Sequence, residues 1–478
     1  MSKKITGWLR LAALALWTGI FMIQFIYAVG WAVQNGNNIQ DFYDTAVYLR
    51  SAQEFTGDGW HLLGYACILR WFQGLTGIIG DSYVVVLYLV QTLCSLAAFT
   101  YGVKVVSKVI WNHNILWWKA GVIALYLVTL PVIWQLQFAL LPDAFCLALL
   151  VLLFSQLLEI LFQHKMLRWE RMWILCGVCL LLGITHYHSF YAASGLILIA
   201  VGILLIKQIR KEYRSRNGIL AAVFLVVILG LTALIGTGVN ESIPKAEPYA
   251  KHTVVAELWS RFVFPHLQED YAFYPEEVKQ VFPEEVLLKG SEYYEFYLSE
   301  VIPYIETKAG DNTSDMCKNM VITSFQLHRN EAIKSFLKES IAYGFIPLFM
   351  EKYMYENSGS LYGHNLMKMW EKAPELTVDY MHISMNGFLI VCCFGIVLLL
   401  FEWISGIKRL RHVIKAVLTS GFCIAGAIVP MMVFSFEKFD YRIGLFSFFI
   451  WGVMTVSLIM GQEWRKDNER KYNKDVEK

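Results

Sequence analysis

Two aspartates and a tyrosine follow the first long apolar stretch, in Asp41-Phe-Tyr-Asp44-Thr-Ala-Val-Tyr48. Asp44 and Tyr48 are one helical turn apart, and Asp41 lies about a turn earlier on the same face. A carboxylate at a membrane interface, in lower dielectric than bulk water, can accept a proton from a hydroxyl or bind a divalent cation. Alternatively, the two acids cap and charge the first turn of a surface helix, worth about 0.3 to 1 kcal/mol. The residues leave both interpretations open.

Two further charged residues lie at the starts of apolar stretches. Asp143 follows Pro142, and an acid after proline also suits an ordinary first helical turn. Arg442 begins the last apolar stretch, and its planar fork of donors suits a lipid-linked phosphate or diphosphate. Pairing with Asp440 or Glu437, or snorkelling to the interface, would satisfy Arg442 equally well.

His186 and His188 flank Tyr187 at a turn between two apolar stretches. Side chains two positions apart diverge on a helix, and no third ligand is evident, so the spacing argues against a metal site. Both histidines remain candidates for hydrogen bonding to a sugar or a phosphate.

The whole chain has the composition of a helical membrane protein. Of its 478 residues, 56% are hydrophobic and 17% are charged, and the mean hydropathy is +0.46. A helix needs about 20 apolar residues to cross a bilayer, and such runs occur at 11 to 33, 83 to 103, 119 to 136, 143 to 162, 173 to 206, 219 to 239, 384 to 403, 416 to 435 and 441 to 461. With 173 to 206 broken at Thr185-His-Tyr-His188, the sequence predicts an all-α polytopic protein of about ten transmembrane helices.

Basic residues predict the orientation of these helices. Lys and Arg gather in alternate connections and both tails, at 3 to 10, 104 to 119, 165 to 171, 207 to 216, 408 to 415 and 465 to 478. By the positive-inside rule both termini are cytoplasmic. The predicted parts are an N-terminal transmembrane module with an acidic first outer loop, an extracytoplasmic domain, C-terminal transmembrane helices and a cytoplasmic tail, at 1 to 239 (loop 34 to 82), 240 to 383, 384 to 461 and 462 to 478.

Two outer segments have distinct compositions. Residues 240 to 383 hold 22 of the 39 acidic and 13 of the 41 basic residues, and helical spacing from Glu331 to Tyr343 predicts a mostly helical domain. The domain's many aromatic side chains either pack its core or stack on sugar rings. Residues 60 to 80 predict a helix in the headgroup layer, with its aromatic residues at the interface: Trp60, Tyr65, Trp71 and Phe72.

The order of these features resembles the GT-C glycosyltransferases, polytopic enzymes that take a sugar from a polyprenyl-phosphate carrier and include protein O-mannosyltransferases and aminoarabinose transferases. Their first-loop motif, Asp-(Glu)-x-x-Tyr before an Ala-containing helix, is similar to Asp44-Thr-Ala-Val-Tyr48 with Ala52, which lacks the Glu. Gly64-Tyr65 is similar to a following Gly-Tyr-Pro without the Pro. Pro142-Asp143 falls where members often carry a second acid, and Tyr441-Arg442 reverses the end of their Glu-x-x-x-Arg-Tyr stretch.

The resemblance implies an inverting membrane glycosyltransferase that acts outside the cytoplasm with a polyprenyl-phosphate-linked sugar as donor. Asp44 would be the general base, with Asp41 as its alternative. Asp143 would orient the acceptor or donor, and Arg442 would stabilise the departing phosphate. The acceptor is unspecified, membrane lipid is the expected partner, no nucleic acid is expected, and a divalent cation is the one cofactor suggested.

Two other functions share part of this pattern. A secondary transporter fits ten helices with outward histidines, but no charged residue falls near the middle of a predicted span, where coupling residues usually lie. A lipid-linked-polysaccharide polymerase or ligase fits the topology, but the predicted outer domain supplies only Arg261 and Arg329. The sequence has no P-loop, G-x-S-x-G or H-E-x-x-H motif, which argues against ATP-driven pumps and soluble-type hydrolases.

Overall fold

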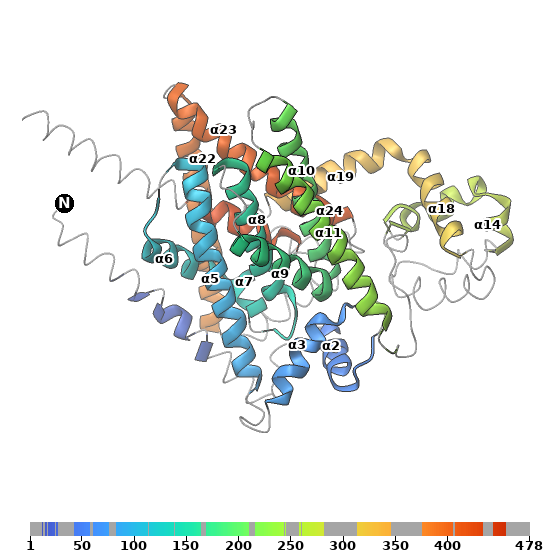
Figure 1. The fold of residues 1–478 in the computed structure, drawn as a ribbon, viewed down its shortest axis with the longest axis horizontal. Coiled ribbons are helices and arrows are strands. Elements are labelled where there is room, and N and C mark those ends of the chain that lie inside the picture. The colour runs from blue at the N-terminus through green and yellow to red at the C-terminus, as the bar shows by residue number, and fades with distance from the viewer. Residues whose placement is uncertain are drawn as a thin grey trace, which may run out of the picture.

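The computed structural model describes a set of helices and the connections between them (Figure 1). The described residues are scattered positions between 12 and 26, and then 43–57, 61–75, 83–112, 114–137, 139–163, 169–209, 216–242, 244, 258–259, 261–281, 313–345, 375–404, 407–433 and 443–455. Every regular element in these ranges is a helix, which confirms the all-α prediction.

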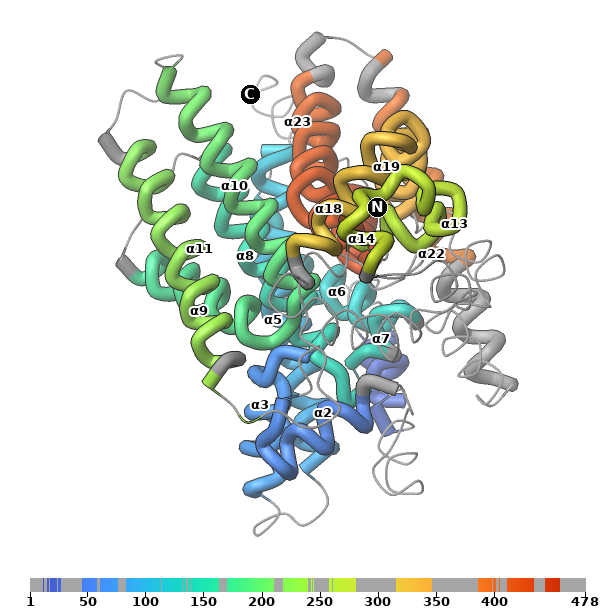
Figure 2. Tube along the Cα trace, turned by 90° about the vertical axis from the view of Figure 1, so that its right-hand side faces the viewer, coloured from blue at the N-terminus to red at the C-terminus, as the bar shows by residue number. Residues whose placement is uncertain are grey.

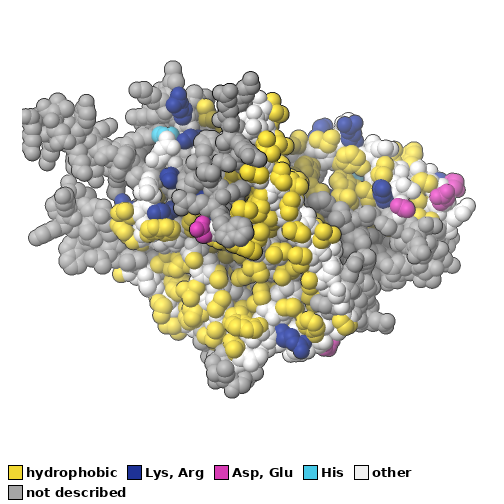
Figure 3. Space-filling view, in the orientation of Figure 1, with side chains coloured by type: hydrophobic (Ala, Val, Ile, Leu, Met, Phe, Trp, Pro, Cys, Tyr) yellow, Lys and Arg dark blue, Asp and Glu magenta, His cyan; other side chains and the backbone are white. Residues whose placement is uncertain are grey.

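Among the described residues, five helical stretches are long and apolar enough to cross a membrane: Tyr83–Trp111, Asp143–Phe162, Tyr187–Ile209, Gly218–Val239 and Arg411–Val433. They belong to helices α5 (Tyr83–Trp111), α8 (Asp143–Gln163), α10 (Tyr187–Ile209), α11 (Arg216–Ser242) and the run that begins with α23 (Ile407–Cys423). Apolar side chains cover most of the described bundle surface in Figure 3, as expected where lipid replaces water. The protein is thus built as a multi-pass membrane protein.

The predicted break within 173 to 206 is confirmed, because α9 (Trp169–Thr185) ends one residue before α10 begins. The predicted single span at 119 to 136 is wrong. It forms two helices, α6 (Trp117–Val128) and α7 (Pro131–Gln137). Pro131 has no backbone N–H to continue α6, and its fixed φ suits the first residue of a new helix.

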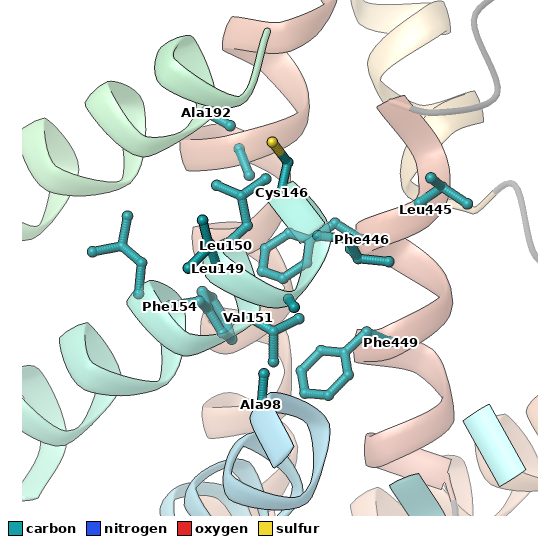
Figure 4. Close-up of a cluster of buried hydrophobic side chains, with 14 of the residues drawn as sticks. Ala98, Cys146, Leu149, Leu150, Val151, Phe154, Ala192, Leu445, Phe446 and Phe449 are labelled. Carbon is teal, nitrogen blue, oxygen red and sulfur yellow. The ribbon is translucent and has the colours of Figure 1, made fainter. Parts of the chain in front are cut away.

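The centre of the bundle is α8, which packs against α5, α9 and α10. In α8, 83% of the apolar stretch is buried, whereas in α11 only 33% is buried. Helix α11 lies at the edge of the bundle, beside α9 and α10 (Figure 2). The last described helix, Ile443–Thr455, packs on α8 and α5 through aromatic rings (Figure 4). Phe446 lies 5.2 Å from Phe154, and Phe449 lies 5.0 Å from Phe99.

A close crossing joins α10 to a π-helical turn, η6 (Ile424–Ile428), between α23 and α24 (Val429–Val433). Gly195 and Gly426 face each other there. A methyl group on Gly195 would lie 2.4 Å from the Gly426 carbonyl oxygen and 2.4 Å from Pro430 Cγ. Only glycine lets the two backbones approach this closely.

The remaining elements include the long helix α22 (Glu375–Ile404) and a smaller group around α18 (Thr313–Leu327) and α19 (Arg329–Gly344). That group also contains η2 (Phe264–His266), α13 (Leu267–Asp270), η3 (Tyr271–Phe273) and α14 (Glu276–Val281). Trp259 and Tyr274 are buried in it, which favours core packing over sugar stacking for these two aromatics. The end of α19 is tied to the bundle, because Ser447 and Trp451 donate hydrogen bonds to the carbonyls of Tyr343 and Gly344.

Candidate functional site at the α2–α3 end of the bundle

Helix α2 (Tyr43–Glu54) carries the first of the predicted site residues. Asp44 and Tyr48 lie in this single helix, one turn apart, as predicted. Of Asp44 the structure describes the backbone alone, and Asp41 and Arg442 lie outside the described residues.

Tyr48 joins α2 to α3 (Leu63–Gly74). Its ring is buried and makes edge-to-face contacts with His61 at 4.9 Å and with Tyr65 at 5.3 Å between centroids. Arg70 of α3 adds a hydrogen bond to the Ala52 carbonyl of α2, at 3.3 Å. The two short helices therefore form one unit, seen at the lower end of the bundle in Figure 1.

The prediction that Tyr65 and Phe72 lie at the membrane interface is wrong, because both are buried. Trp71, whose ring contacts that of Phe72 edge to face, is exposed. The Tyr65 hydroxyl donates a hydrogen bond of 3.0 Å to Gln91 Oε1 on α5. An amphipathic helix can turn its aromatic side chains toward a protein core as readily as toward lipid headgroups, and here α3 packs on α5 and α9.

A buried polar network continues from Tyr65 into the turn before α8. Gln91 Nε2 donates to the Gln137 carbonyl at 3.1 Å, and Gln137 Nε2 donates to Ser95 Oγ at 2.9 Å. Ser95 Oγ lies 3.5 Å from the Ala144 carbonyl. Because each bond spans different elements, the network fixes the α7–α8 turn against α5. This turn delivers Asp143 to the first position of α8.

Asp143 is buried, with 7% of its surface exposed, although it carries a formal charge. Its place in the first turn of α8 fits the structural role of an acid at a helix N-terminus. The Asp143 carboxylate also affects the Tyr65 phenol electrostatically. Burial first, then Tyr88 and the Asp143 carboxylate, raise the pKa of Tyr65 well above its ordinary value. Tyr65 is therefore a neutral hydrogen-bond donor over the physiological range.

The histidine turn adjoins the same side chains. Helix α10 packs against α8, and in its first turn Ser189 Oγ lies 3.4 Å from His186 Nδ1. On the other side, Gly64 of α3 packs directly on the backbone of Ile184, at the end of α9. The segment around His186 thus contacts both α3 and α8.

The two histidines do not diverge as their spacing predicted. Their rings lie 5.1 Å apart at 72° to each other. His186 is the single residue between α9 and α10, so the two histidines do not lie within one uninterrupted helix.

The structure places Tyr48 against Tyr65, whose phenol is affected by the Asp143 carboxylate, and His186 beside Ser189. Sequence reasoning gave no site role to the polar residues around them, which are Tyr65, Gln91, Ser95, Gln137 and Ser189. The available signal was the pair of glutamines in otherwise apolar stretches, since a buried amide needs hydrogen-bond partners. The resulting site has one buried carboxylate, a neutral phenol and two imidazoles, groups suited to hydrogen bonding and proton transfer.

No protein-family model matches the chain, and neither a curated protein nor a solved structure is detectably similar to it. The fold therefore defines the class alone: a helical protein whose described part contains five helices able to cross a membrane.

Proposed function

We propose that this protein is a membrane glycosyltransferase that moves a sugar from a polyprenyl-phosphate carrier to an acceptor hydroxyl on the extracytoplasmic side. Asp44 is the general base, with Asp41 as its alternative, and Asp143 orients a substrate. Arg442 stabilises the departing phosphate. His186 and His188 offer hydrogen bonds at the edge of the site.

One observation supports this assignment more than any other. Helix α2 carries Asp44 and the start of α8 carries Asp143, and Tyr65 of α3 is a neighbour of both helices. Tyr65 contacts the Tyr48 ring and also lies in the field of the Asp143 carboxylate. Two acidic segments that are distant in the sequence thus share a buried phenol as a neighbour, which supports their belonging to one site.

The proposed topology has about ten transmembrane helices, cytoplasmic termini and the α2–α3 unit outside the cytoplasm. Basic residues at the opposite end of the bundle support it. Lys207, near the end of α10, donates a hydrogen bond to the Leu161 carbonyl near the end of α8. Lys415 of α23 reaches Asn112, just past α5. Lysines at the end of the bundle away from the α2–α3 unit fit the positive-inside rule with that end in the cytoplasm.

The reaction balances with these groups alone. The acceptor oxygen forms a bond to the anomeric carbon, and its proton passes to the Asp44 carboxylate. The bond between that carbon and the phosphate oxygen breaks, and the phosphate leaves with the electron pair as an anion beside Arg442. Positioned base catalysis contributes about 10² to 10⁴ in rate, and losing one well-placed donor to the leaving oxygen costs about 3 to 4 kcal/mol.

The test is release of free polyprenyl phosphate by the purified full-length protein, followed by mass spectrometry with a polyprenyl-phosphate sugar and a mixture of acceptors. We expect release by the wild type and a loss of about 10² to 10⁴ in Asp44→Asn. Glu54→Gln, an exposed acid at the far end of α2, is the matched control and keeps full activity. A folded Asp44→Asn protein with the wild-type rate would refute the assignment of the base.

A secondary transporter is the second candidate, and one pair of residues favours it. Glu159 is buried inside α8, with Arg171 at 2.7 Å and the Tyr101 hydroxyl at 3.0 Å. Buried charges within a membrane stretch often mark ion or substrate paths. A transporter would move the carrier lipid or sugar without releasing polyprenyl phosphate, and Glu159→Gln would abolish its movement, whereas the transferase tolerates that change.

The polymerase or ligase alternative has less support. Such enzymes would need arginines of the 240 to 383 segment for phosphate binding. Arg261 is already engaged, because its guanidinium donates to the Met432 carbonyl at 2.6 Å and forms an ion pair with Glu339. This arginine holds α19 to α24 and is not available for substrate.

A further inference from the structure

Two copies of the pattern His-x-x-Glu meet far from the α2–α3 unit. The first, His266 to Glu269, runs from η2 into α13, and the second, His328 to Glu331, joins α18 to α19. The two imidazole rings stack with centroids 3.8 Å apart and planes 11° apart. Ligand atoms of His266, Glu269 and His328 all lie within 4.8 Å of one another. Figure 2 shows α13, α18 and α19 grouped together.

A buried carboxylate orients one of the imidazoles. Asp270 has 2% of its side chain exposed, and its Oδ1 lies 2.7 Å from His328 Nε2. A His–carboxylate bond of this kind fixes the ring and leaves the other nitrogen as the ligand, as around many protein-bound metals. Asp270 Oδ2 is also buried and has no hydrogen-bond partner among the described residues. The carboxylate is therefore not part of an ordinary, fully satisfied surface ion pair.

On the side of the imidazoles away from Asp270, hydrogen-bond acceptors of the histidines face those of the glutamates. With the proton of His328 on Nε2, toward Asp270, the Nδ1 lone pair faces Glu331 Oε2 at 3.9 Å. His266 Nδ1 faces Glu269 Oε2 at 3.8 Å in the same way. Both distances are too long for direct hydrogen bonds. A single dication between these groups would attract the two nitrogen lone pairs and both carboxylates.

We propose that His266, Glu269 and His328, with Glu331 as a fourth ligand, bind a divalent transition-metal ion such as Zn²⁺, and that Asp270 positions His328. Two imidazoles and two carboxylates suit zinc, whose bonds to such ligands are about 2.0 to 2.2 Å. Four protein ligands make a closed, structural site. Glu269 and Glu331 are 75% and 76% exposed, so both are free to close on an ion arriving from solvent.

The ion would clamp two segments that are distant in the sequence, since Asp270 and His328 are 58 residues apart. It would also fix the start of α19, whose other end is bonded to the bundle at Tyr343 and Gly344. This role is separate from sugar transfer, and the proposal stands whether or not the protein is a transferase.

The test uses full-length protein in detergent, stripped with a chelator and then titrated with Co²⁺ and with Zn²⁺ against a chromophoric chelator. We expect one ion per chain, visible Co²⁺ bands of a tetrahedral site that Zn²⁺ abolishes, and a higher unfolding temperature with Zn²⁺. The paired variant Glu269→Gln with Glu331→Gln should weaken binding by at least about tenfold and remove the thermal shift. Asp270→Asn should weaken it by about 10 to 100-fold.

Controls keep the result independent of folding. Glu276→Gln, an exposed acid of α14 that pairs with Lys279, matches the glutamate variants in charge and must bind the ion like the wild type. The glutamate variants change exposed side chains only, so the unfolding temperature of their metal-free forms should equal that of the metal-free wild type. Absence of stoichiometric binding by the wild type, or unchanged binding by His266→Gln with His328→Gln, would overturn the proposal and leave two His–carboxylate ion pairs only.

Discussion

The α2–α3 end of the bundle and the paired His-x-x-Glu cluster both concentrate polar side chains, but they satisfy them in opposite ways. At the α2–α3 end, Tyr65, Gln91 and Gln137 are buried and bond to one another or to backbone carbonyls. In the cluster, the imidazoles and exposed glutamates converge without direct hydrogen bonds on their open side. The first arrangement fixes the positions of the helices relative to one another. The second leaves ligand atoms that could bind an ion.

This difference predicts which region tolerates change. In a buried network whose hydrogen bonds are all made, losing one bond or displacing one helix disturbs the other members, because no water can replace the missing partner. An exposed ligand set loses its ion when one ligand is lost but leaves the surrounding helices in place. Matched substitutions in the two regions should therefore separate sugar transfer from metal binding.

The largest effect should come from exchanging one carboxylate in each region. Asp143→Asn should lower the rate of sugar transfer by about 10 to 100-fold, the equivalent of one charged hydrogen bond, and leave Zn²⁺ binding unchanged. Glu331→Gln should weaken Zn²⁺ binding and leave transfer unchanged. Polyprenyl phosphate release and Zn²⁺ competition, measured on both variants, check this cross-over. Loss of both properties in either variant would mean that the two regions are coupled.

A smaller effect should follow from moving α3 off α9. In Gly64→Ala the new methyl carbon would lie 2.4 Å from the Ile184 carbonyl oxygen, so α3 must shift and carry Tyr65 with it. Overpacking of this kind costs about 1 to 3 kcal/mol. Thermal unfolding in detergent measures the loss, and transfer activity should fall with it.

Gly74→Ala is the control for that variant, because a methyl group at the end of the same helix meets nothing within 4 Å. Equal stability of the two variants would show that α3 is not held against α9 as described.

The crossing of α10 and η6 should be about as sensitive but should leave the site chemistry alone. Gly195→Ala places a methyl group 2.4 Å from the Gly426 carbonyl oxygen, whereas Gly202→Ala, two turns further along α10, meets nothing within 4 Å. We expect Gly195→Ala to lower stability by about 1 to 3 kcal/mol. Gly202→Ala should be neutral or slightly stabilising. Stability curves of the two variants in the same detergent provide the comparison.

Periodicity and composition were sufficient to predict the helical class, the break before Tyr187 and the helix that carries Asp44 and Tyr48. They did not predict the break at Pro131, because the apolar run continues through it and hydropathy alone does not register a missing N–H. Tyr65 was misplaced for a related reason. Its hydrophobic neighbours mark an apolar face without saying whether protein or lipid covers it.

The cluster of histidines and carboxylates could not have been found from spacing. His-x-x-Glu is a short pattern, and its two copies are brought together by the fold around α13, α18 and α19, with Asp270 as the link. Pairing between distant segments is tertiary information. The sequence-derived roles of Asp41 and Arg442 stay predictions, because both residues lie outside the described part of the chain.

The smallest effect, and the one that probes the comparison most finely, is removal of a single hydroxyl. Tyr65→Phe leaves the ring against Tyr48 but takes away the donor to Gln91 Oε1, and a bond between helices of this kind is worth about 1 kcal/mol in membrane proteins. Gln91 also holds the turn before α8. Without its bond to Tyr65 the position of Asp143 should be less well fixed, so the rate of sugar transfer should fall by a larger factor than the loss of stability alone would cause. Tyr83→Phe, on a half-buried tyrosine of α5, is the control. If Tyr65→Phe lowers stability and leaves the transfer rate unchanged, the network supports the fold without positioning Asp143.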